Sequence, residues 1–224
     1  MQVLKHPSVE RVDHVDLDEF VIEVCREHFP WGSAWEDPRV TLHVADGAEF
    51  VRGAAGGSYD VVVQDSSDPF TWDSDGNRVD LPSNVLYSRP HMEEILRVLS
   101  PGGALNLQAE TFQIPSDLEG IVEWRAQAMD LGYADARYGS LIISSYPTGQ
   151  IGFLLCTKSL GGGESPPSLS DIEERYTDMV RRGKRTAYYQ PKLQFSSFDL
   201  PLWVEEAMYG TSIISQIEGE GDEL

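Results

Sequence analysis

The sequence has few cysteines and few basic residues. It carries 2 cysteines in 224 residues, Cys25 and Cys156, which lie far apart with no paired metal ligands near them. This excludes a disulfide framework and offers no zinc-binding pattern, so we expect two core thiols. Lysine and arginine number 17 against 37 aspartates and glutamates, which gives a formal net charge of −20. Because nucleic-acid binding needs clustered basic residues, this composition argues against a nucleic-acid partner and favours a cationic substrate.

The sequence also lacks a long apolar run. No stretch approaches the roughly 18 apolar residues of a membrane span, and the first residues lack a basic-then-apolar signal pattern. We therefore predict a cytoplasmic protein with no membrane partner. The composition that is present, 41% hydrophobic with 10% aromatic residues, is that of a globular protein with one main domain. We expect this domain over residues 1–208 and an acidic tail without fixed structure over 209–224.

Short segments rich in valine, isoleucine and leucine alternate with helical patterns along the chain. This alternation predicts an α/β fold with a mostly parallel sheet covered by helices on both faces. Strands are predicted near residues 11–16, 40–45, 59–65, 103–109, 136–145 and 150–157. Helices are predicted near residues 18–29, 88–99, 117–131 and 169–182.

Turn and breaker residues refine this pattern. The segment Tyr146-Pro147-Thr148-Gly149 separates the last two predicted strands, which indicates an antiparallel pair at the end of the sheet. Pro101-Gly102-Gly103 is expected to stop the helix near 88–99, and Gly132 is a candidate C′ residue of the next one. On the first helix, Val21, Val24, Cys25 and His28 recur at helical spacing. Residues 66–86 are expected to be irregular.

Polar residues directly after an apolar strand are candidate ligand contacts, because ligands gather at the carboxyl ends of parallel strands. Asp16 ends the first predicted strand, and its carboxylate can accept hydrogen bonds from both hydroxyls of a ribose. The alternative is that it caps the following helix. Asp46 follows the second strand and can bond an adenine amino group, while Gly47 allows close approach of the backbone. The alternative there is an ordinary Asp-Gly turn.

The third predicted strand ends with two carboxylates three residues apart, Asp65 and Asp68. Such a pair suits a ligand with ammonium groups, since a nearby cation favours ionised carboxylates and offsets their repulsion. A solvated turn with two surface aspartates is the alternative. Tyr146 can place its ring face or hydroxyl against the same cation, or it can simply pack on the sheet.

Three segments together resemble the spermidine synthase family of polyamine aminopropyltransferases. They are Leu4–Glu10, the Asp-Ser-Ser-Asp-Pro segment at 65–69 and the Tyr-Pro-Thr-Gly-Gln-Ile-Gly-Phe segment at 146–153. The resemblance implies a class I methyltransferase-like (Rossmann-like) fold. It also implies transfer of an aminopropyl group from decarboxylated S-adenosylmethionine to putrescine, giving spermidine and methylthioadenosine. The nucleotide is a co-substrate, so no cofactor and no metal are expected, and a homodimer is left open.

The resemblance also implies roles for the candidate residues. Asp65 takes the position of the catalytic base, and Asp68 and Tyr146 take positions that hold the diamine. The segment Gln108-Ala109-Glu110 matches a strand end that lines the same cleft.

By the same resemblance, Asp16 occupies the ribose-binding acidic position, where glutamate is more usual. Asp46 and Gly47 occupy adenine-side positions.

The sequence departs from the family pattern in two places. The family's β-rich N-terminal domain, first strand and glycine-rich loop would precede Met1, so the sheet is expected to lack its first strand. Residues 70–80 replace a short Gly-Pro segment, and we expect a tolerated surface loop beside the amine site. Alternatives left open are an inactive or partner-dependent subunit, a related spermine or thermospermine synthase, and a putrescine N-methyltransferase.

Overall fold

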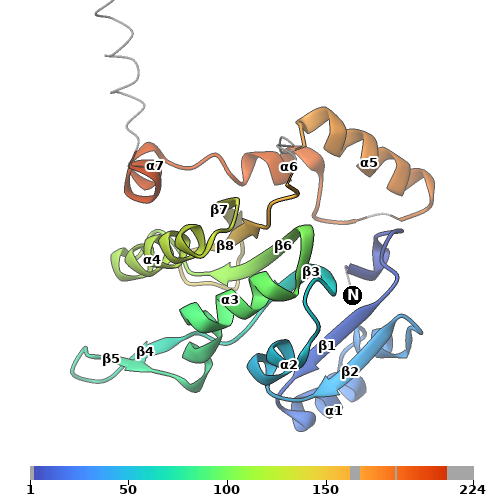
Figure 1. Ribbon diagram of the computed structural model, residues 1–224, viewed down its shortest axis with the longest axis horizontal. Helices are drawn as coiled ribbons and strands as arrows, with labels where there is room; N and C mark the ends of the chain where they lie inside the picture. Colours follow the sequence, from blue (N-terminus) through green and yellow to red (C-terminus); the bar gives the residue numbers. More distant parts are fainter. Residues whose placement is uncertain (1–2, 162–166, 185, 211–224) are drawn as a thin grey trace, which may run out of the picture. The chain divides into compact units, whose positions relative to one another are not determined.

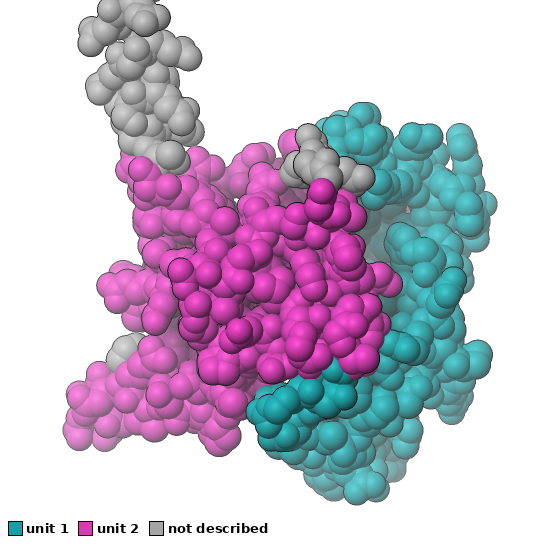
Figure 2. All heavy atoms as spheres, in the orientation of Figure 1, with its two compact units in different colours: residues 1–54, 165–193 teal, residues 55–164, 194–224 magenta. Residues whose placement is uncertain are grey.

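The computed structural model describes residues 3–161, 167–184 and 186–210 (Figure 1). The chain divides into two compact units, one formed by residues 1–54 and 165–193 and the other by residues 55–164 and 194–224 (Figure 2). The expected single domain over 1–208 remains a prediction. Of the expected tail, only Tyr209 and Gly210 lie within the described residues, and they belong to the end of a helix and its cap.

The first unit is built on a parallel strand pair, β1 (Val12–Asp16) and β2 (Val40–Val44). The two strands run in register, so Asp16 lies opposite Val44 at their carboxyl ends. The helical elements of this unit are η1 (Val3–Lys5), α1 (Glu19–His28), η2 (Gly32–Glu36), α2 (Gly47–Gly53) and α5 (Leu169–Arg181). The short helix α6 (Pro191–Ser196) runs across the sequence boundary of the two units.

The second unit contains a four-stranded sheet in the order β3-β6-β8-β7. The strands β3 (Tyr59–Gln64) and β6 (Leu99–Ala109) are parallel, and β8 (Gln150–Thr157) is antiparallel to both β6 and β7 (Asp135–Ile142). The predicted antiparallel C-terminal pair is therefore confirmed. The described strands thus form two separate hydrogen-bonded main sheets, one in each unit, with parallel pairing in both.

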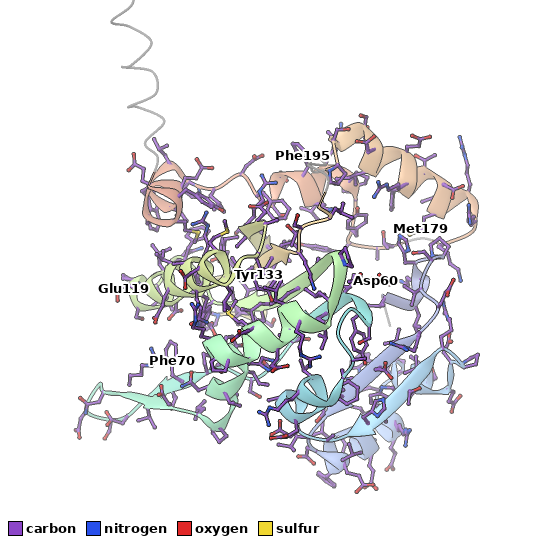
Figure 3. The ribbon with its side chains drawn as sticks, viewed as in Figure 1. Asp60, Phe70, Glu119, Tyr133, Met179 and Phe195 are labelled. Carbon is purple, nitrogen blue, oxygen red and sulfur yellow. The ribbon has the colours of Figure 1, made fainter. Side chains whose placement is uncertain are left out.

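Helices α3 (Arg89–Val98) and α4 (Pro115–Leu131) contact each other and pack on strands of the second sheet (Figure 1). The core between them contains side chains with no more than 1% of their surface exposed: Met92, Ile95, Leu105, Leu107, Ile121, Tyr138 and Leu154. The Tyr133 hydroxyl, drawn in Figure 3, donates to the Met92 carbonyl at 2.9 Å and ties the chain after α4 to α3. The last helix, α7 (Leu202–Tyr209), contacts α4. Helix α3 thus packs on β6, and α4 packs on β7 and β8.

The segment 66–86 is more ordered than expected. It contains an antiparallel hairpin, β4 (Phe70–Trp72) and β5 (Arg78–Asp80), followed by the 3₁₀ helix η3 (Pro82–Tyr87). Local turn chemistry closes the hairpin, because Asp73 Oδ1 accepts the backbone N–H groups of Asp75 and Asn77 at 2.9 and 2.8 Å. The prediction of an irregular segment was therefore wrong for these residues.

The hairpin is fastened at its base. The Leu81 N–H donates to the Pro69 carbonyl at 2.9 Å, and the Ser83 hydroxyl donates to the Asp68 carbonyl. The two chain segments that enter and leave the hairpin are thus joined directly beside Asp68.

The predicted helix stop at Pro101-Gly102-Gly103 was also wrong. Helix α3 ends at Val98, and β6 begins with Leu99. The three residues lie inside β6, where the register with β3 shifts between the pairs Tyr59–Leu99 and Val61–Ala104. They form an irregularity in the strand of the β-bulge type. Gly132, by contrast, caps α4 with φ 96° as predicted.

The helix predicted near residues 18–29 is confirmed as α1, and its buried residue is Ile22, which is 2% exposed. Val21 is 45% exposed and His28 lies on the surface. The expectation of two core thiols needs correction. Cys156 is a buried core thiol as expected, but Cys25 is only half-buried. None of the described helices combines the length and apolar character needed to cross a bilayer.

Candidate active site

In the first unit, Asp16 lies at the tip of β1, and the capping alternative does not account for it. The N-cap of α1 is Asp18, whose Oδ1 accepts the N–H groups of Phe20 and Val21 at 2.9 and 3.4 Å. Asp16 Oδ1 accepts the Asp18 N–H at 2.9 Å and so orients the residue that caps. The structure therefore assigns the helix cap to Asp18 and leaves Asp16 at the carboxyl end of a parallel strand.

Asp46 and Gly47 lie at the same end of the strand pair, just beyond β2. Asp46 is the N-cap of α2, because its Oδ1 accepts the N–H groups of Ala48 and Glu49 at 2.8 and 3.0 Å. Gly47 is the first residue of that helix. Both cap bonds fall on Oδ1, so Asp46 Oδ2 takes no part in them. Asp46 thus has a structural role, and its second oxygen is the candidate ligand contact.

The second unit brings together Asp65, Asp68 and Tyr146. Both aspartates are exposed in the segment after β3. In one orientation, the Gln108 amide nitrogen donates to the Tyr146 hydroxyl at 3.3 Å. With the amide turned over, it donates to Asp65 Oδ1 at 3.3 Å and to the Ser66 carbonyl at 3.0 Å, and this orientation satisfies both ends of the amide. Gln108, on β6, therefore lies between the catalytic candidate and the tyrosine.

The charges around Tyr146 support the same grouping. The pKa of its phenol is raised first by burial and then by the negative charges of Glu110, Asp68 and Asp65. The three acids follow the carboxyl ends of two neighbouring parallel strands, Asp65 and Asp68 after β3 and Glu110 after β6. Their concentration of negative charge is the arrangement expected of a site for ammonium groups.

Glu110 is a main member of this cluster. The resemblance indicated this residue only as part of the segment Gln108-Ala109-Glu110, which lines the cleft. It directly follows β6 and is half-buried. Burial, the charges of Asp68 and Asp117, and a side-chain hydrogen bond with Asp68 raise the Glu110 pKa to about 7. Its backbone carbonyl accepts a 2.7 Å hydrogen bond from the buried Tyr138 hydroxyl, which fixes the chain at this point.

Two further members of the cluster, Tyr87 and Asp117, were not predicted from the sequence. Tyr87 is 3% exposed, its hydroxyl accepts from Ser66 Oγ at 3.2 Å, and burial is the main cause that raises its pKa to about 12. Asp117 lies in the first turn of α4, and its pKa is raised mainly by burial, with a smaller contribution from the charge of Asp68. An acid in a first helical turn is usually explained by the helix dipole, so the sequence held no specific signal for it.

The hairpin lies next to this cluster and contributes to a separate cavity. Phe70, drawn in Figure 3, lines a cavity of about 230 Å³ together with Tyr87, Glu123 and Trp124. The Tyr87 hydroxyl therefore bonds Ser66, and Tyr87 also lines the cavity that Phe70 of the hairpin borders. Across the described residues, no three His, Cys, Asp or Glu side chains are grouped so that they could hold a metal ion.

Solved structures support the fold. A crystal structure of spermidine synthase in complex with the transition state analogue AdoDATO matches with a TM-score of 0.76 at 22% identity, over 93% of this chain and 64% of that one. Human methyltransferase-like protein 13 in complex with SAH matches with a TM-score of 0.53 at 18% identity, over 84% of this chain and 78% of that one. The fold is thus of the class I methyltransferase-like type, as the sequence predicted.

Sequence comparison identifies the family. Spermidine synthase 2 of Arabidopsis thaliana is 32% identical over 211 residues, which are 92% of this chain and 57% of that protein. Putrescine N-methyltransferase 1 of Nicotiana tabacum is 31% identical over 201 residues, 89% of this chain and 50% of that protein. The chain therefore spans 50 to 57% of the length of these curated relatives. The family described as "Spermine/spermidine synthase domain" matches residues 1–162, well over half of the sequence, so the chain belongs to the spermine/spermidine synthase family.

Proposed function

We propose that the chain carries the acceptor-binding, catalytic and adenosine-binding residues of a spermidine synthase-type aminopropyltransferase. The reaction would move an aminopropyl group from decarboxylated S-adenosylmethionine to putrescine, giving spermidine and methylthioadenosine. The observation that carries this proposal is the position of Asp65, Asp68 and Glu110 just beyond the carboxyl ends of two neighbouring parallel strands, with the Tyr146 hydroxyl bonded to Gln108 of β6, in a chain of this family. Such a cluster suits an acceptor with two ammonium groups.

The proposed chemistry needs a base at the acceptor nitrogen. The donor's sulfonium makes the neighbouring methylene electrophilic, and methylthioadenosine leaves as a neutral thioether when a neutral amine attacks in line. Aliphatic ammonium groups titrate near pH 10, by analogy with lysine at about 10.4, so the acceptor must lose a proton before it can attack. Asp65 would accept that proton, while Asp68 and Tyr146 hold the diamine and align its nitrogen with the methylene. No metal or redox step is needed for this displacement.

The charge of the cluster also suits a decarboxylated donor. The transferred arm must reach the acceptor amine, so its terminal group would meet Asp65, Asp68 and Glu110. A terminal carboxylate there would meet like charges, whereas the arm of the decarboxylated donor ends in an ammonium group. Donor choice would then be electrostatic in part.

The adenosine part of the donor is assigned to the first unit, with Asp16 at the ribose and Asp46 and Gly47 at the adenine. We expect Asp16→Ala to weaken methylthioadenosine binding about tenfold or more, as is typical for losing hydrogen bonds to a charged group. Putrescine affinity should change far less, because the diamine contacts lie elsewhere. Calorimetric titration with each ligand measures both effects.

The matched control for this change is Asp18→Asn. Asparagine caps a helix about as well as aspartate, so α1 should persist and nucleoside affinity should stay near that of the unchanged protein. Equal losses for both ligands, or an unchanged affinity for methylthioadenosine, would remove Asp16 from the ribose position.

A second candidate function is methyl transfer to putrescine, which the 31% identity with the tobacco putrescine N-methyltransferase favours. Incubation of the purified protein with putrescine and either donor separates the two. Spermidine formed only from decarboxylated S-adenosylmethionine supports the proposal. N-methylputrescine formed from S-adenosylmethionine supports the alternative, and spermidine offered as acceptor tests for a longer-chain synthase. Binding of both substrates with no product from any pair would indicate an inactive or partner-dependent subunit.

A further inference from the structure

We propose that Tyr87 is a positioning residue for aminopropyl transfer. Its hydroxyl, acting through the Ser66 hydroxyl, holds Asp65 where a base must lie to take a proton from the acceptor amine. The inference rests on the proposed function, because the base and the acceptor are the ones proposed there. It adds a buried residue that acts through a neighbour of the base rather than on the substrate.

The segment that carries Asp65 has no regular backbone structure of its own. Strand β3 ends at Gln64, and residues 65–68 belong to no helix or strand. Asp65 is exposed, whereas the next residue, Ser66, is half-buried. A base must lie within hydrogen-bond reach of the proton that it removes, so its place in such a segment depends on the bonds that its neighbours make.

Ser66 is the anchored residue of this segment. Its hydroxyl donates to the Tyr87 hydroxyl at 3.2 Å and accepts from the Gln64 side-chain amide at 3.4 Å. Its carbonyl accepts from the turned Gln108 amide of β6 at 3.0 Å, and the same amide reaches Asp65 Oδ1 at 3.3 Å. Bonds thus hold Ser66 both by its side chain and by its backbone, and they fix the residue next to the base.

Tyr87 is itself firmly placed. Its side chain is 3% exposed, its ring lies against Trp124 with 4.8 Å between the ring centroids, and its carbonyl accepts from Gln127 Nε2 at 3.4 Å. Both partners lie on α4. The Leu86 carbonyl accepts from Gln64 Nε2 at 3.0 Å, which ties η3 to the end of β3. Burial raises the pKa of Tyr87 to about 12, so its hydroxyl keeps its proton at neutral pH. Tyr87 therefore offers a fixed hydroxyl to the segment after β3.

Loss of this bond should affect the chemical step more than binding of the acceptor. The acceptor is assigned to Asp68 and Tyr146, whereas the base is Asp65. A misplacement of about 1 Å at a reacting group can cost about 100-fold in rate. Tyr87→Phe removes only the hydroxyl and leaves the ring against Trp124. We therefore expect it to lower kcat about tenfold or more, while the KM for putrescine stays within about twofold.

Combination with the base variant identifies the target of this effect. If Tyr87 acts by placing Asp65, it has no base to place in Asp65→Asn. Adding Tyr87→Phe to that variant should then leave its residual turnover within about twofold. Ser66→Ala should reproduce the loss seen in Tyr87→Phe, and the two together should lose no more than either alone, because both changes remove the same bond. Multiplied losses in either combination would overturn the proposal.

The matched control is Tyr133→Phe, which removes the hydroxyl of another buried tyrosine in the same unit. Tyr133 is 2% exposed, and its hydroxyl donates to the Met92 carbonyl at 2.9 Å (Figure 3). The midpoint of thermal unfolding can fall as far as in Tyr87→Phe, but kcat should stay within about twofold of the unchanged protein. Equal kcat losses in the two tyrosine variants, or an unchanged kcat in Tyr87→Phe, would assign the Tyr87 hydroxyl to the fold alone.

A second measurement separates this inference from the proposed function. If the unchanged chain forms no spermidine from putrescine and decarboxylated S-adenosylmethionine, the proposed function is wrong for this chain, but the placement of the segment can still be observed. Nitrogen-15 relaxation of the ligand-free full chain gives backbone order parameters, which are about 0.85 for a rigid amide and below about 0.6 for a flexible one. The Ser66 amide should be rigid in the unchanged chain and in Tyr133→Phe, and clearly less rigid in Tyr87→Phe. An equally rigid Ser66 amide in Tyr87→Phe would refute the positioning role whatever the protein catalyses.

Discussion

Asp65→Asn is expected to reduce turnover of aminopropyl transfer by at least about 100-fold, the lower range for the loss of a general base. Asparagine keeps the shape of the side chain and an oxygen that can accept the bond from Gln108, but it cannot take a proton from the acceptor amine. Asp65 is exposed at the end of β3, so the midpoint of thermal unfolding should change little. Steady-state turnover with decarboxylated donor and putrescine, together with thermal melting, measures both quantities.

Asp60→Asn is the control for this result. Asp60 is an exposed aspartate at the other end of the same strand, where its Oδ1 accepts a 2.8 Å bond from the Ser100 hydroxyl (Figure 3). Asparagine can accept that bond equally well, so turnover should stay within about twofold of the unchanged protein. If Asp65→Asn retained near-normal turnover, or if both variants lost activity alike, Asp65 would not be the base.

Gly152→Ala is expected to destabilise the fold by about 1–3 kcal/mol, the usual range for adding an atom to a packed interior. A Cβ atom at this position on β8 would overlap the ring and hydroxyl of Tyr138. Tyr138 has no exposed surface, and its hydroxyl bonds the Glu110 carbonyl at 2.7 Å and Gln150 Nε2 at 3.0 Å. The ring cannot yield without disturbing these bonds. Thermal and denaturant unfolding should show the loss, and acceptor affinity should fall with it because the Glu110 backbone moves.

Gly120→Ala provides the comparison. Gly120 lies within α4, and the nearest atom to an added Cβ is 3.9 Å away on the Trp124 ring. Alanine is the better helix former, so stability should stay equal or increase by up to about 1 kcal/mol. Equal unfolding free energies for the two variants would show that β8 accommodates a side chain at position 152 and that Tyr138 does not constrain it.

The regular elements could be predicted because their physical signals are local. The apolar run Tyr59–Gln64 and the paired segments 135–142 and 150–157 predict strands, and a helix that starts after Asp18 follows from its capping side chain. The hairpin at 70–80 could not be predicted in this way. Its strands are three residues each, too short for their apolar alternation to predict a strand. Only the turn chemistry of Asp73 and Gly76 carried a signal.

The residues of the candidate site differ in the same way, because some follow from a local sequence pattern and others do not. Asp65 and Asp68 could be identified because they follow an apolar strand directly, where ligands of parallel sheets are bound. The importance of Glu110 depends on its distance to Asp68, which is 42 residues away in sequence, and on burial by neighbours that no local pattern specifies. Asp117 and Tyr87 belong to helices whose own patterns explain them fully. Spatial neighbours of this kind become visible only in the folded chain.

The closed base of the hairpin makes residues 70–80 a permissive place for insertion. Leu81 bonds back to Pro69 and Ser83 to the Asp68 carbonyl, so hydrogen bonds outside the hairpin strands hold the backbone at Asp68. Doubling the length of a flexible loop adds only about 0.6 kcal/mol to the entropic free-energy cost of closing it. We therefore expect changes in the length of this segment to leave the acceptor residues beside it in place. The same property makes it a practical position for grafting a recognition peptide or a reporter module.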